Sequence, residues 1–325
     1  MKKPSVFITR QIHPQAIDQL TQTCQVDVWP EPYPPPHSLL VQKAHQVQGL
    51  LTLLTDPVDA EVLAPQNLLV ISQMAVGTDN IDLGAASERR LPGGHTPGIL
   101  TETCADFTMA LLLCVARRIV EASNEVSQGK WLPWGPDILT GGELCGSTLG
   151  LVGFGRIGQA VARRATGFDM RILYTDHKRN PEIEHKTGAI PCSLDELLSQ
   201  SDFVSLHVYL SPENRHLLDY PQFKRMKPSA YLINTSRGPI INPAALTWAI
   251  QNQRIAGAAL DVFDPEPIPA DHPLLGTPNV VITPHIASAG KPTRIRMAHM
   301  AVENLIAGLK GERLPFCANP DIYNS

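Results

Sequence analysis

The stretch LGLVGFGRIGQAVA, residues 149–162, decides the fold of this chain. A short apolar run leads into three glycines with the spacing G-x-G-x-x-G, and residues of helical character follow. Gly153 permits a tight turn, Gly155 lets the backbone approach a pyrophosphate, and Gly158 lets the helix pack closely on the strand. The anion would then lie at the positive end of the helix. The pattern predicts a dinucleotide-binding sheet.

An acidic residue follows at the spacing that such a site requires. Asp176 comes 18 residues after Gly158, at the end of the next predicted strand. A similar loop and acidic residue also occur in methyltransferase nucleoside sites, and a plain packing turn is a further alternative. Asp176 would accept both ribose hydroxyls of NAD and repel a 2′-phosphate, which favours NAD(H). NADP(H) stays open, because the cations that follow either form a solvated loop or hold that phosphate: His177, Lys178 and Arg179.

Length and composition narrow the class of protein. A chain of 325 residues is too long for one ordinary core, which predicts two domains. The net charge of −4 gives no electrostatic case for binding nucleic acid or an anionic membrane. No apolar stretch has the length of a signal peptide or a membrane span. The six cysteines are scattered without zinc spacing, so we expect reduced thiols, no metal and a cytoplasmic location.

Two α/β domains are predicted from alternating strands and helices. The first hundred residues are typical of a small flavodoxin-like domain, with strands expected at 5–9, 26–29, 49–54 and 68–73. From Gly146 onward the alternation restarts and indicates a doubly wound parallel sheet of the Rossmann type. Its six expected strands are 149–153, 170–174, 203–208, 230–234, 257–262 and 280–283.

The order of these segments predicts an insertion. A helix at about 292–309 is expected to return to the first domain. The dinucleotide-binding domain, residues 100–286, would therefore be inserted in a smaller substrate-binding domain made of residues 1–99 and 287–325. A long apolar helix over 101–118 is expected to be buried in the protein or against a second subunit.

Three strand ends in the second domain lead into residues suited to acid, base or anion chemistry, namely Arg237, Glu266 and His285. Ligands bind beyond the carboxyl ends of parallel strands, so these side chains are expected to converge. The planar fork of Arg237 matches a carboxylate or carbonyl oxygen, and histidine is the residue type whose reference pKa lies near neutral pH, which suits His285 to a proton step. Glu266 would hydrogen-bond the imidazole and fix its tautomer.

Each of the three also has an ordinary structural explanation. Arg237 could stabilise a turn, Glu266 could be a solvated loop carboxylate, and His285 could be a buried histidine with its hydrogen bonds satisfied. Together, beside a dinucleotide loop, they predict hydride transfer to a 2-keto acid with His285 as proton donor. Asp261, inside an apolar strand, is a further anomaly, because a buried carboxylate needs partners from nicotinamide or a neighbouring backbone.

These residues resemble the D-isomer-specific 2-hydroxyacid dehydrogenases, and among them the glyoxylate/hydroxypyruvate reductases. The match covers almost the whole chain, through the glycine loop and the segments 74–82, 96–102, 233–238, 259–263 and 283–288. The chain departs from the pattern at His95, where asparagine is usual. Related reductases that prefer NADP tend to carry Ser-Arg where this chain has Asp176 and His177.

The resemblance implies roles for individual residues. Arg237 would orient the substrate, Glu266 would assist, and His285 would be the acid/base. The backbone N–H groups of Val76 and Gly77 would hold the substrate carboxylate, with Leu53 nearby. Cofactor contacts are implied for Gly153, Gly155, Arg156, Ile157, Gly158, Asp176, Thr235 and Asp261. A homodimer built on the helix 101–118 is also implied.

The expected activity is NAD(P)H-dependent reduction of glyoxylate or hydroxypyruvate to the D-2-hydroxy acid. Two alternatives stay open at this point. One is a dehydrogenase of another 2-hydroxy acid such as 3-phosphoglycerate. The other is a non-catalytic, dinucleotide-sensing protein similar to corepressors of the same fold.

Overall fold

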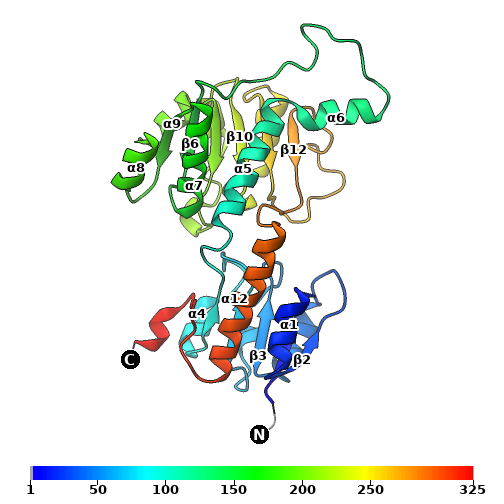
Figure 1. Cartoon of the computed structure of the whole chain (residues 1–325), viewed down its shortest axis with the longest axis vertical. Helices are drawn as coiled ribbons and strands as arrows, with labels where there is room; N and C mark the ends of the chain where they lie inside the picture. Colours follow the sequence, from blue (N-terminus) through cyan, green and yellow to red (C-terminus); the bar gives the residue numbers. More distant parts are fainter. Residues whose placement is uncertain (1–2, 325) are drawn as a thin grey trace. The chain divides into compact units, whose positions relative to one another are not determined.

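The computed structural model describes residues 3–324, which divide into two compact units. The first unit contains the chain up to Leu100 and again from Gly290 onward, and the second runs from Thr101 to Ala289. The boundaries expected from the sequence were at residues 99/100 and 286/287. In chain order, the second unit interrupts the first (Figure 1).

The first unit is built on a five-stranded parallel sheet. Its strands are β1 (Ser5–Ile8), β2 (Gln25–Val28), β3 (Gly49–Thr52), β4 (Val70–Gln73) and β5 (Gly93–Gly94), in the order β2-β1-β3-β4-β5. This is the flavodoxin order, which confirms the predicted fold class of this unit. The sequence did not predict β5, because two glycines carry no apolar alternation.

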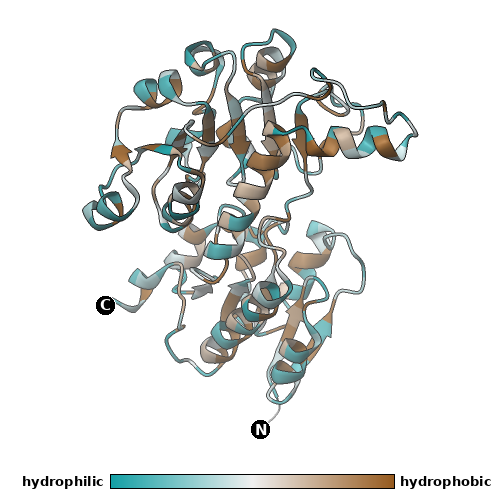
Figure 2. Cartoon of the chain, turned by 45° about the horizontal axis from the view of Figure 1, so that its top comes forward, coloured by the Kyte–Doolittle hydropathy of each residue, from teal (hydrophilic) through white to brown (hydrophobic). Residues whose placement is uncertain are grey.

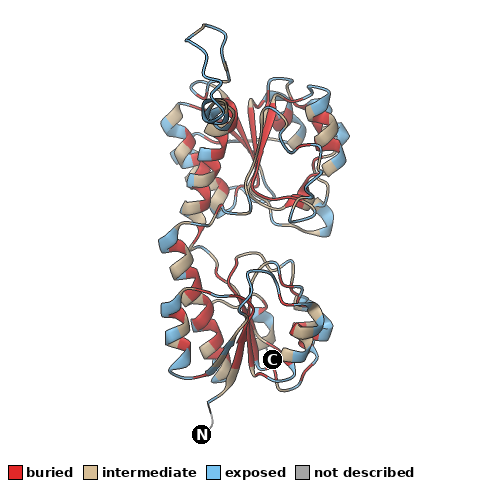
Figure 3. Cartoon of the chain, turned by 90° about the vertical axis from the view of Figure 1, so that its right-hand side faces the viewer, coloured by how far each residue is buried: buried red, intermediate tan, exposed pale blue. Residues whose placement is uncertain are grey.

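Helices cover both faces of this sheet. The helices α1 (Pro14–Thr21) and α12 (Lys291–Leu309) pack on one face, where a Cβ at Gly308 would lie 2.5 Å from Val70. On the other face, a core that includes Phe7 and Ile71 is closed by α2 (His37–Ala44), α3 (Ala60–Leu63) and α4 (Leu83–Glu88). Figure 3 shows the strands as the buried layer between exposed helix faces.

The second unit is built on a seven-stranded parallel sheet. Its strands are β6 (Thr148–Val152), β7 (Arg171–Thr175), β8 (Ile190–Pro191), β9 (Phe203–Leu206), β10 (Tyr231–Asn234), β11 (Gly257–Leu260) and β12 (Val280–Ile282). The order β12-β11-β10-β9-β6-β7-β8 places β6 at the point where the strand order reverses. This confirms the Rossmann-type sheet, with the short edge strand β8 in addition to the six expected strands.

Two hydrophobic cores lie on the two faces of the second sheet. One packs beneath α5 (Thr101–Ala116) and α7 (Arg156–Ala165). The other packs beneath α9 (Leu194–Gln200), α10 (Tyr220–Arg225) and α11 (Pro243–Gln251). A further helix, α8 (Pro181–Thr187), follows β7.

The prediction of one helix over 101–118 was wrong at its end. The helix α5 stops at Ala116, whose carbonyl oxygen accepts a hydrogen bond from the N–H of Gly142 at 2.9 Å. Arg118 then adopts a left-handed conformation (φ 50°), and a separate helix α6 (Ile119–Ser127) begins. The left-handed residue ends the helix, and an ion pair from Arg118 to Glu121, at 2.7 Å, lies at the start of α6.

The helix α6 and the segment 128–140 extend from the body of the second unit (Figure 1). Apolar stretches lie along them in Figure 2, and several large side chains there are exposed. They are Ile119, Val120, Val126, Trp131, Leu132, Trp134 and Ile138.

Across residues 3–324, no helix combines the length and apolar character needed to cross a membrane. In the same range, no group of three or more His, Cys, Asp or Glu side chains is arranged to hold a metal ion.

Candidate active site

The glycine loop after β6 leaves room for an anion at the start of α7. Gly153 has φ 96°, and a Cβ there would lie 2.7 Å from backbone atoms of His207. A Cβ at Gly158 would lie 2.3 Å from the carbonyl oxygen of Gly153, so only glycine allows helix and turn to pack this closely. At Gly155, the N-cap of α7, a Cβ would meet nothing within 4 Å. The loop therefore fits a pyrophosphate at the helix N-terminus, where Arg156 and Ile157 form the first turn.

Asp176 is fixed beside this loop by backbone donors. Its carboxylate accepts a hydrogen bond from the N–H of Phe154 at 2.6 Å and another from the N–H of Lys178 at 3.0 Å. The ring of Phe154 stacks on Tyr174 of β7, with 3.9 Å between ring centroids. The acidic side chain is thus held at the carboxyl end of β7, next to the glycine turn.

Arg179 is engaged by an acidic residue of α8. Its Nε and Nη2 donate to the carboxylate of Glu184, at 3.1 and 2.5 Å, and the hydroxyl of Tyr174 donates to the same carboxylate. The hydrogen bond from Arg179, followed by that from Tyr174, lowers the pKa of Glu184 to about 2. Glu184 is therefore charged at neutral pH and pairs with Arg179.

His285 and Glu266 are in direct contact. The Nδ1 atom of His285 lies 2.9 Å from Oε2 of Glu266, and Oε1 of Glu266 accepts a hydrogen bond from the N–H of Phe263 at 2.8 Å. Burial opposes ionisation of Glu266, but the hydrogen bond and charge of His285, the Phe263 N–H and the charge of Arg237 outweigh it. The pKa of Glu266 is consequently lowered, so a carboxylate faces Nδ1 and leaves Nε2 of the imidazole for chemistry.

The loop that carries His285 is held by Asp261, whose side chain is buried at the end of β11. One carboxylate oxygen accepts from the hydroxyl of Thr283 at 2.6 Å and from the N–H of Ile286 at 2.8 Å. The other accepts from the N–H of Ala287 at 2.7 Å. His285 itself has φ 53°, and its N–H donates to the carbonyl oxygen of Asp261 at 2.9 Å. A neighbouring backbone thus provides partners for this carboxylate, one of the two sources anticipated from the sequence.

Arg237 is placed beside the Glu266 loop by a turn after β10. The side chain of Asn234 accepts from the N–H of Ser236 at 3.0 Å and donates to the carbonyl oxygen of Arg237 at 2.9 Å. A Cβ at Gly238 would lie 1.9 Å from the carbonyl oxygen of Phe263, so the two loops touch through their backbones. The charge of Arg237 contributes to the lowering of the pKa of Glu266. Within the second unit, the turn that carries Arg237 thus contacts the loop of Glu266, and Glu266 contacts His285.

Thr235, the predicted cofactor contact in the same turn, also faces α5. Its hydroxyl oxygen lies 3.0 Å from that of Thr108.

Leu53, Val76 and Gly77 belong to the first unit. Leu53 follows β3, and Val76 and Gly77 follow β4, so they come from the carboxyl ends of adjacent strands. All three are half-buried. The N–H of Leu53 donates to the carboxylate of Asp56 at 2.7 Å.

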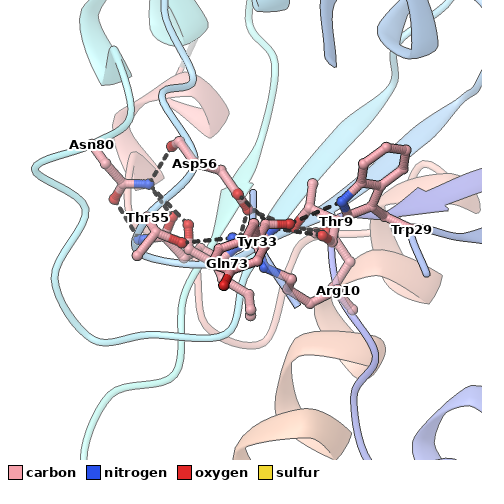
Figure 4. Close-up of polar contacts among 10 residues, drawn as sticks. Thr9, Arg10, Trp29, Tyr33, Thr55, Asp56, Gln73 and Asn80 are labelled. Atoms are coloured by element: carbon pink, nitrogen blue, oxygen red, sulfur yellow. Dashed lines mark hydrogen bonds and ion pairs between the residues drawn. The ribbon is translucent and has the colours of Figure 1, made fainter. Parts of the chain in front are cut away.

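A polar network beneath these residues was not anticipated from the sequence. Figure 4 shows Asp56, Gln73 and Asn80 joined by hydrogen bonds, together with Thr9 and Arg10. Asp56 and Gln73 are fully buried, and the polar Gln73 at the end of apolar strand β4 is the one signal that could have pointed to this network.

Comparison with known proteins identifies the fold of the second unit more closely. A family described as "D-isomer specific 2-hydroxyacid dehydrogenase, NAD binding domain" matches residues 109–287. The second unit therefore binds a nicotinamide dinucleotide.

Relatives extend the similarity to the whole chain. A glyoxylate reductase of Korarchaeum cryptofilum is 48% identical over 322 residues, which covers 98% of this chain and 97% of that protein. A crystal structure of a protein from Thermus thermophilus has a TM-score of 0.91 and 45% identity, and covers 97% of this chain and 99% of that one. An NADPH-dependent glyoxylate/hydroxypyruvate reductase of Sinorhizobium meliloti, solved with NADP and malonate, has a TM-score of 0.86 and 28% identity, with 98% of each chain covered.

The glycine loop, the paired His285 and Glu266 and the full-length similarity agree with one another. The chain belongs to the family of D-isomer-specific 2-hydroxyacid dehydrogenases.

Proposed function

We propose that this enzyme reduces a small 2-keto acid, glyoxylate or hydroxypyruvate, to the D-2-hydroxy acid with NADH as the hydride donor. The observation that carries the proposal is the contact of His285 with Glu266 at the carboxyl edge of the sheet that bears the glycine loop. A proton donor and a hydride source on one edge are what reduction of a carbonyl needs. The names of the relatives support the substrate class.

The substrate is held through its charge and its carbonyl group. The N–H groups of Val76 and Gly77 bind the carboxylate, with Leu53 beside it, because backbone donors in a turn form an anion site. Arg237 orients the substrate, since its planar guanidinium can donate two parallel hydrogen bonds to oxygen atoms.

His285 supplies the proton. Its Nδ1 donates to Glu266, so the protonated ring presents Nε2–H, which is transferred to the carbonyl oxygen as that oxygen becomes an alkoxide. The negative charge of Glu266 stabilises the protonated ring before transfer. When bound, the nicotinamide dinucleotide supplies the hydride. The residues that would hold it are Gly153, Gly155, Arg156, Ile157, Gly158, Asp176, Thr235 and Asp261.

The preference for NADH rests on two neighbouring side chains. Asp176 is fixed beside the glycine loop, where its charge would repel a 2′-phosphate. Arg179, one of the cations that could hold such a phosphate, is paired with Glu184. Binding of NADPH through His177, Lys178 and Arg179 would require that pair to open.

A homodimer is the proposed assembly, and the scattered cysteines support a reducing, cytoplasmic location. The exposed apolar side chains of α6 and 128–140 adjoin a groove of about 240 Å³ between α6 and residues 276–281. Each copy thus offers both an apolar segment, α6 with residues 128–140, and a groove. In a two-fold dimer the apolar segment of each copy would be covered by the partner copy. Light scattering should give twice the mass of the chain, and a monomer at micromolar concentration would contradict this assembly.

Oxidation of NADH and NADPH in the presence of four keto acids tests the proposed function. We expect turnover with glyoxylate or hydroxypyruvate, and a higher kcat/KM with NADH than with NADPH. Pyruvate and phosphohydroxypyruvate test for a different 2-hydroxy acid. Tight cofactor binding without turnover of any keto acid would overturn the enzymatic interpretation in favour of a sensing protein.

A further inference from the structure

Three successive carbonyl groups in the turn after β4 are each held by a donor. The carbonyl oxygen of Ala75 accepts from the N–H of Thr96 at 2.8 Å. The carbonyl oxygen of Val76 lies 3.0 Å from Nδ1 of His95, and that of Gly77 accepts from Nε2 of Gln73 at 2.6 Å. The orientation of three consecutive peptide planes is therefore set from outside the turn.

The opposite side of these peptide planes carries N–H groups. In a trans peptide the N–H points away from the C=O of the same unit, so the N–H groups of Val76, Gly77 and Thr78 point away from the three donors. Within residues 3–324, none of these N–H groups donates a hydrogen bond to the protein backbone. Successive outward N–H groups form a site for an anion.

His95 is itself held rigidly. Its N–H donates to the carbonyl oxygen of Phe316, and its carbonyl oxygen accepts from Nδ2 of Asn304, both at 3.0 Å. Asn304 is fully buried in α12 and also accepts from the N–H of Phe316 at 2.9 Å. Because a carbonyl oxygen can only accept, the contact with Val76 requires the proton on Nδ1 of His95.

Gln73 is held by a second amide. Its side chain and that of Asn80 exchange two hydrogen bonds, at 2.9 and 2.8 Å. Asn80 also donates to the carbonyl oxygens of Leu53 and Asp56, at 3.2 and 2.8 Å, which ties the loop after β3 to the loop after β4 (Figure 4). Beneath them, the buried carboxylate of Asp56 is paired with Arg10 at 3.2 Å.

We propose that His95 and Gln73 are positioning residues that preform a cradle of three N–H groups, those of Val76, Gly77 and Thr78, for the substrate carboxylate. The inference rests on the proposed function for its substrate class and adds Thr78 as a third donor. Asparagine at position 95 should perform the same task as His95, because its side chain can also donate one N–H to the carbonyl of Val76.

Substitution of His95 tests the proposal. His95→Leu removes the donor to Val76, so the KM for glyoxylate should rise roughly tenfold, the effect of one hydrogen bond in a charged site, with kcat within about twofold. His95→Asn restores a donor and should bring KM back to within about threefold of the wild-type value. Gln73→Met removes the donor to Gly77, which comes from β4 and not from the segment of His95. It should likewise raise KM and leave kcat within about twofold.

His299→Leu is the matched control, because it removes a histidine whose Nδ1 bonds Gln19 at 2.8 Å elsewhere in the first unit. Its KM should stay at the wild-type value. The proposal is overturned if His95→Leu leaves KM unchanged, if His95→Asn is as impaired as His95→Leu, or if the control raises KM equally.

Binding of oxamate, measured by calorimetry with saturating cofactor, separates this inference from the proposed function. If the wild-type enzyme turns over no keto acid, the proposed function fails. The cradle still predicts that oxamate binds the wild type and binds His95→Leu roughly tenfold more weakly. Equal affinity for the two proteins would refute the cradle.

Discussion

The protein holds the loop that carries His285 by its backbone N–H groups, and it holds the turn that carries Gly77 by its backbone carbonyl groups. In the second unit, buried Asp261 accepts hydrogen bonds from backbone N–H groups, so the backbone is held inward and a side chain is presented. In the first unit, His95 and Gln73 hold backbone carbonyls, so side chains serve as supports and N–H groups are presented. Both loops follow strands of a parallel sheet.

The difference matches the chemistry proposed for each loop. Backbone N–H groups do not titrate near neutral pH, which suits them to binding a carboxylate but not to moving a proton. An imidazole paired with a carboxylate can move a proton. A buried acceptor or a buried donor behind a loop thus selects which kind of functional group the loop offers.

Among the variants that compare the two loops, removal of His285 should lower kcat the most. In His285→Ala no side chain replaces the proton donor, so kcat should fall by roughly a hundredfold or more. Steady-state kinetics with glyoxylate measure this. A kcat within a few-fold of the wild-type value would remove His285 from the mechanism and with it the contrast between the two loops.

Asp261→Asn tests the support behind His285. An amide nitrogen would face a backbone N–H or the Thr283 hydroxyl, so one buried donor loses its acceptor and stability should fall by about 1–3 kcal/mol. The loop should also shift, and kcat should fall about tenfold, since a small misplacement of a catalytic group is costly. Urea unfolding and steady-state kinetics give the two values.

Asp202→Asn is the matched control for this variant. The carboxylate of Asp202 also accepts a hydrogen bond from a backbone N–H, that of Thr148 at the start of β6, at 2.9 Å. It pairs with Lys227 at 2.8 Å. It should lose stability but keep kcat. A normal kcat in Asp261→Asn would show that Asp261 does not position His285.

Much of the second unit could be predicted from the sequence, because its signals are local. The glycine spacing from Gly153 to Gly158 specifies strand, turn and helix within a few residues. The contact of Glu266 with His285 was expected from the chemistry of the two side chains, but its geometry could not be predicted, since it depends on how the segment after Phe263 folds back. The break at Arg118 was also missed, because an apolar pattern does not reveal a left-handed residue.

The supports of the first unit were hidden for a different reason. Asn80 contacts Leu53 and Asp56 across more than twenty residues, and His95 meets Asn304 across about two hundred. Polar residues that pair over such separations leave no periodic pattern. Local sequence patterns thus point to the candidate functional residues better than to the residues that hold them.

Glu266→Gln, which alters the partner of His285 in the second unit, should lower kcat less than removal of His285 does. Glutamine can still accept from Nδ1 of His285 but carries no charge, so kcat should fall roughly tenfold with little change in KM. Because the pKa of Glu266 lies below its ordinary value of 4.5, the stability that its charge contributes is present above that value. It is lost as the pH falls through the lowered pKa of the folded state.

A double-mutant cycle of His95→Leu and Glu266→Gln tests most directly the claim that one loop binds and the other transfers the proton. The first change should act on KM and the second on kcat, so their effects on kcat/KM should combine within about 0.5 kcal/mol of additivity. The account predicts a double variant with the KM of one single variant and the kcat of the other. A coupling of about 1 kcal/mol or more, or a kcat lowered by His95→Leu alone, would contradict it.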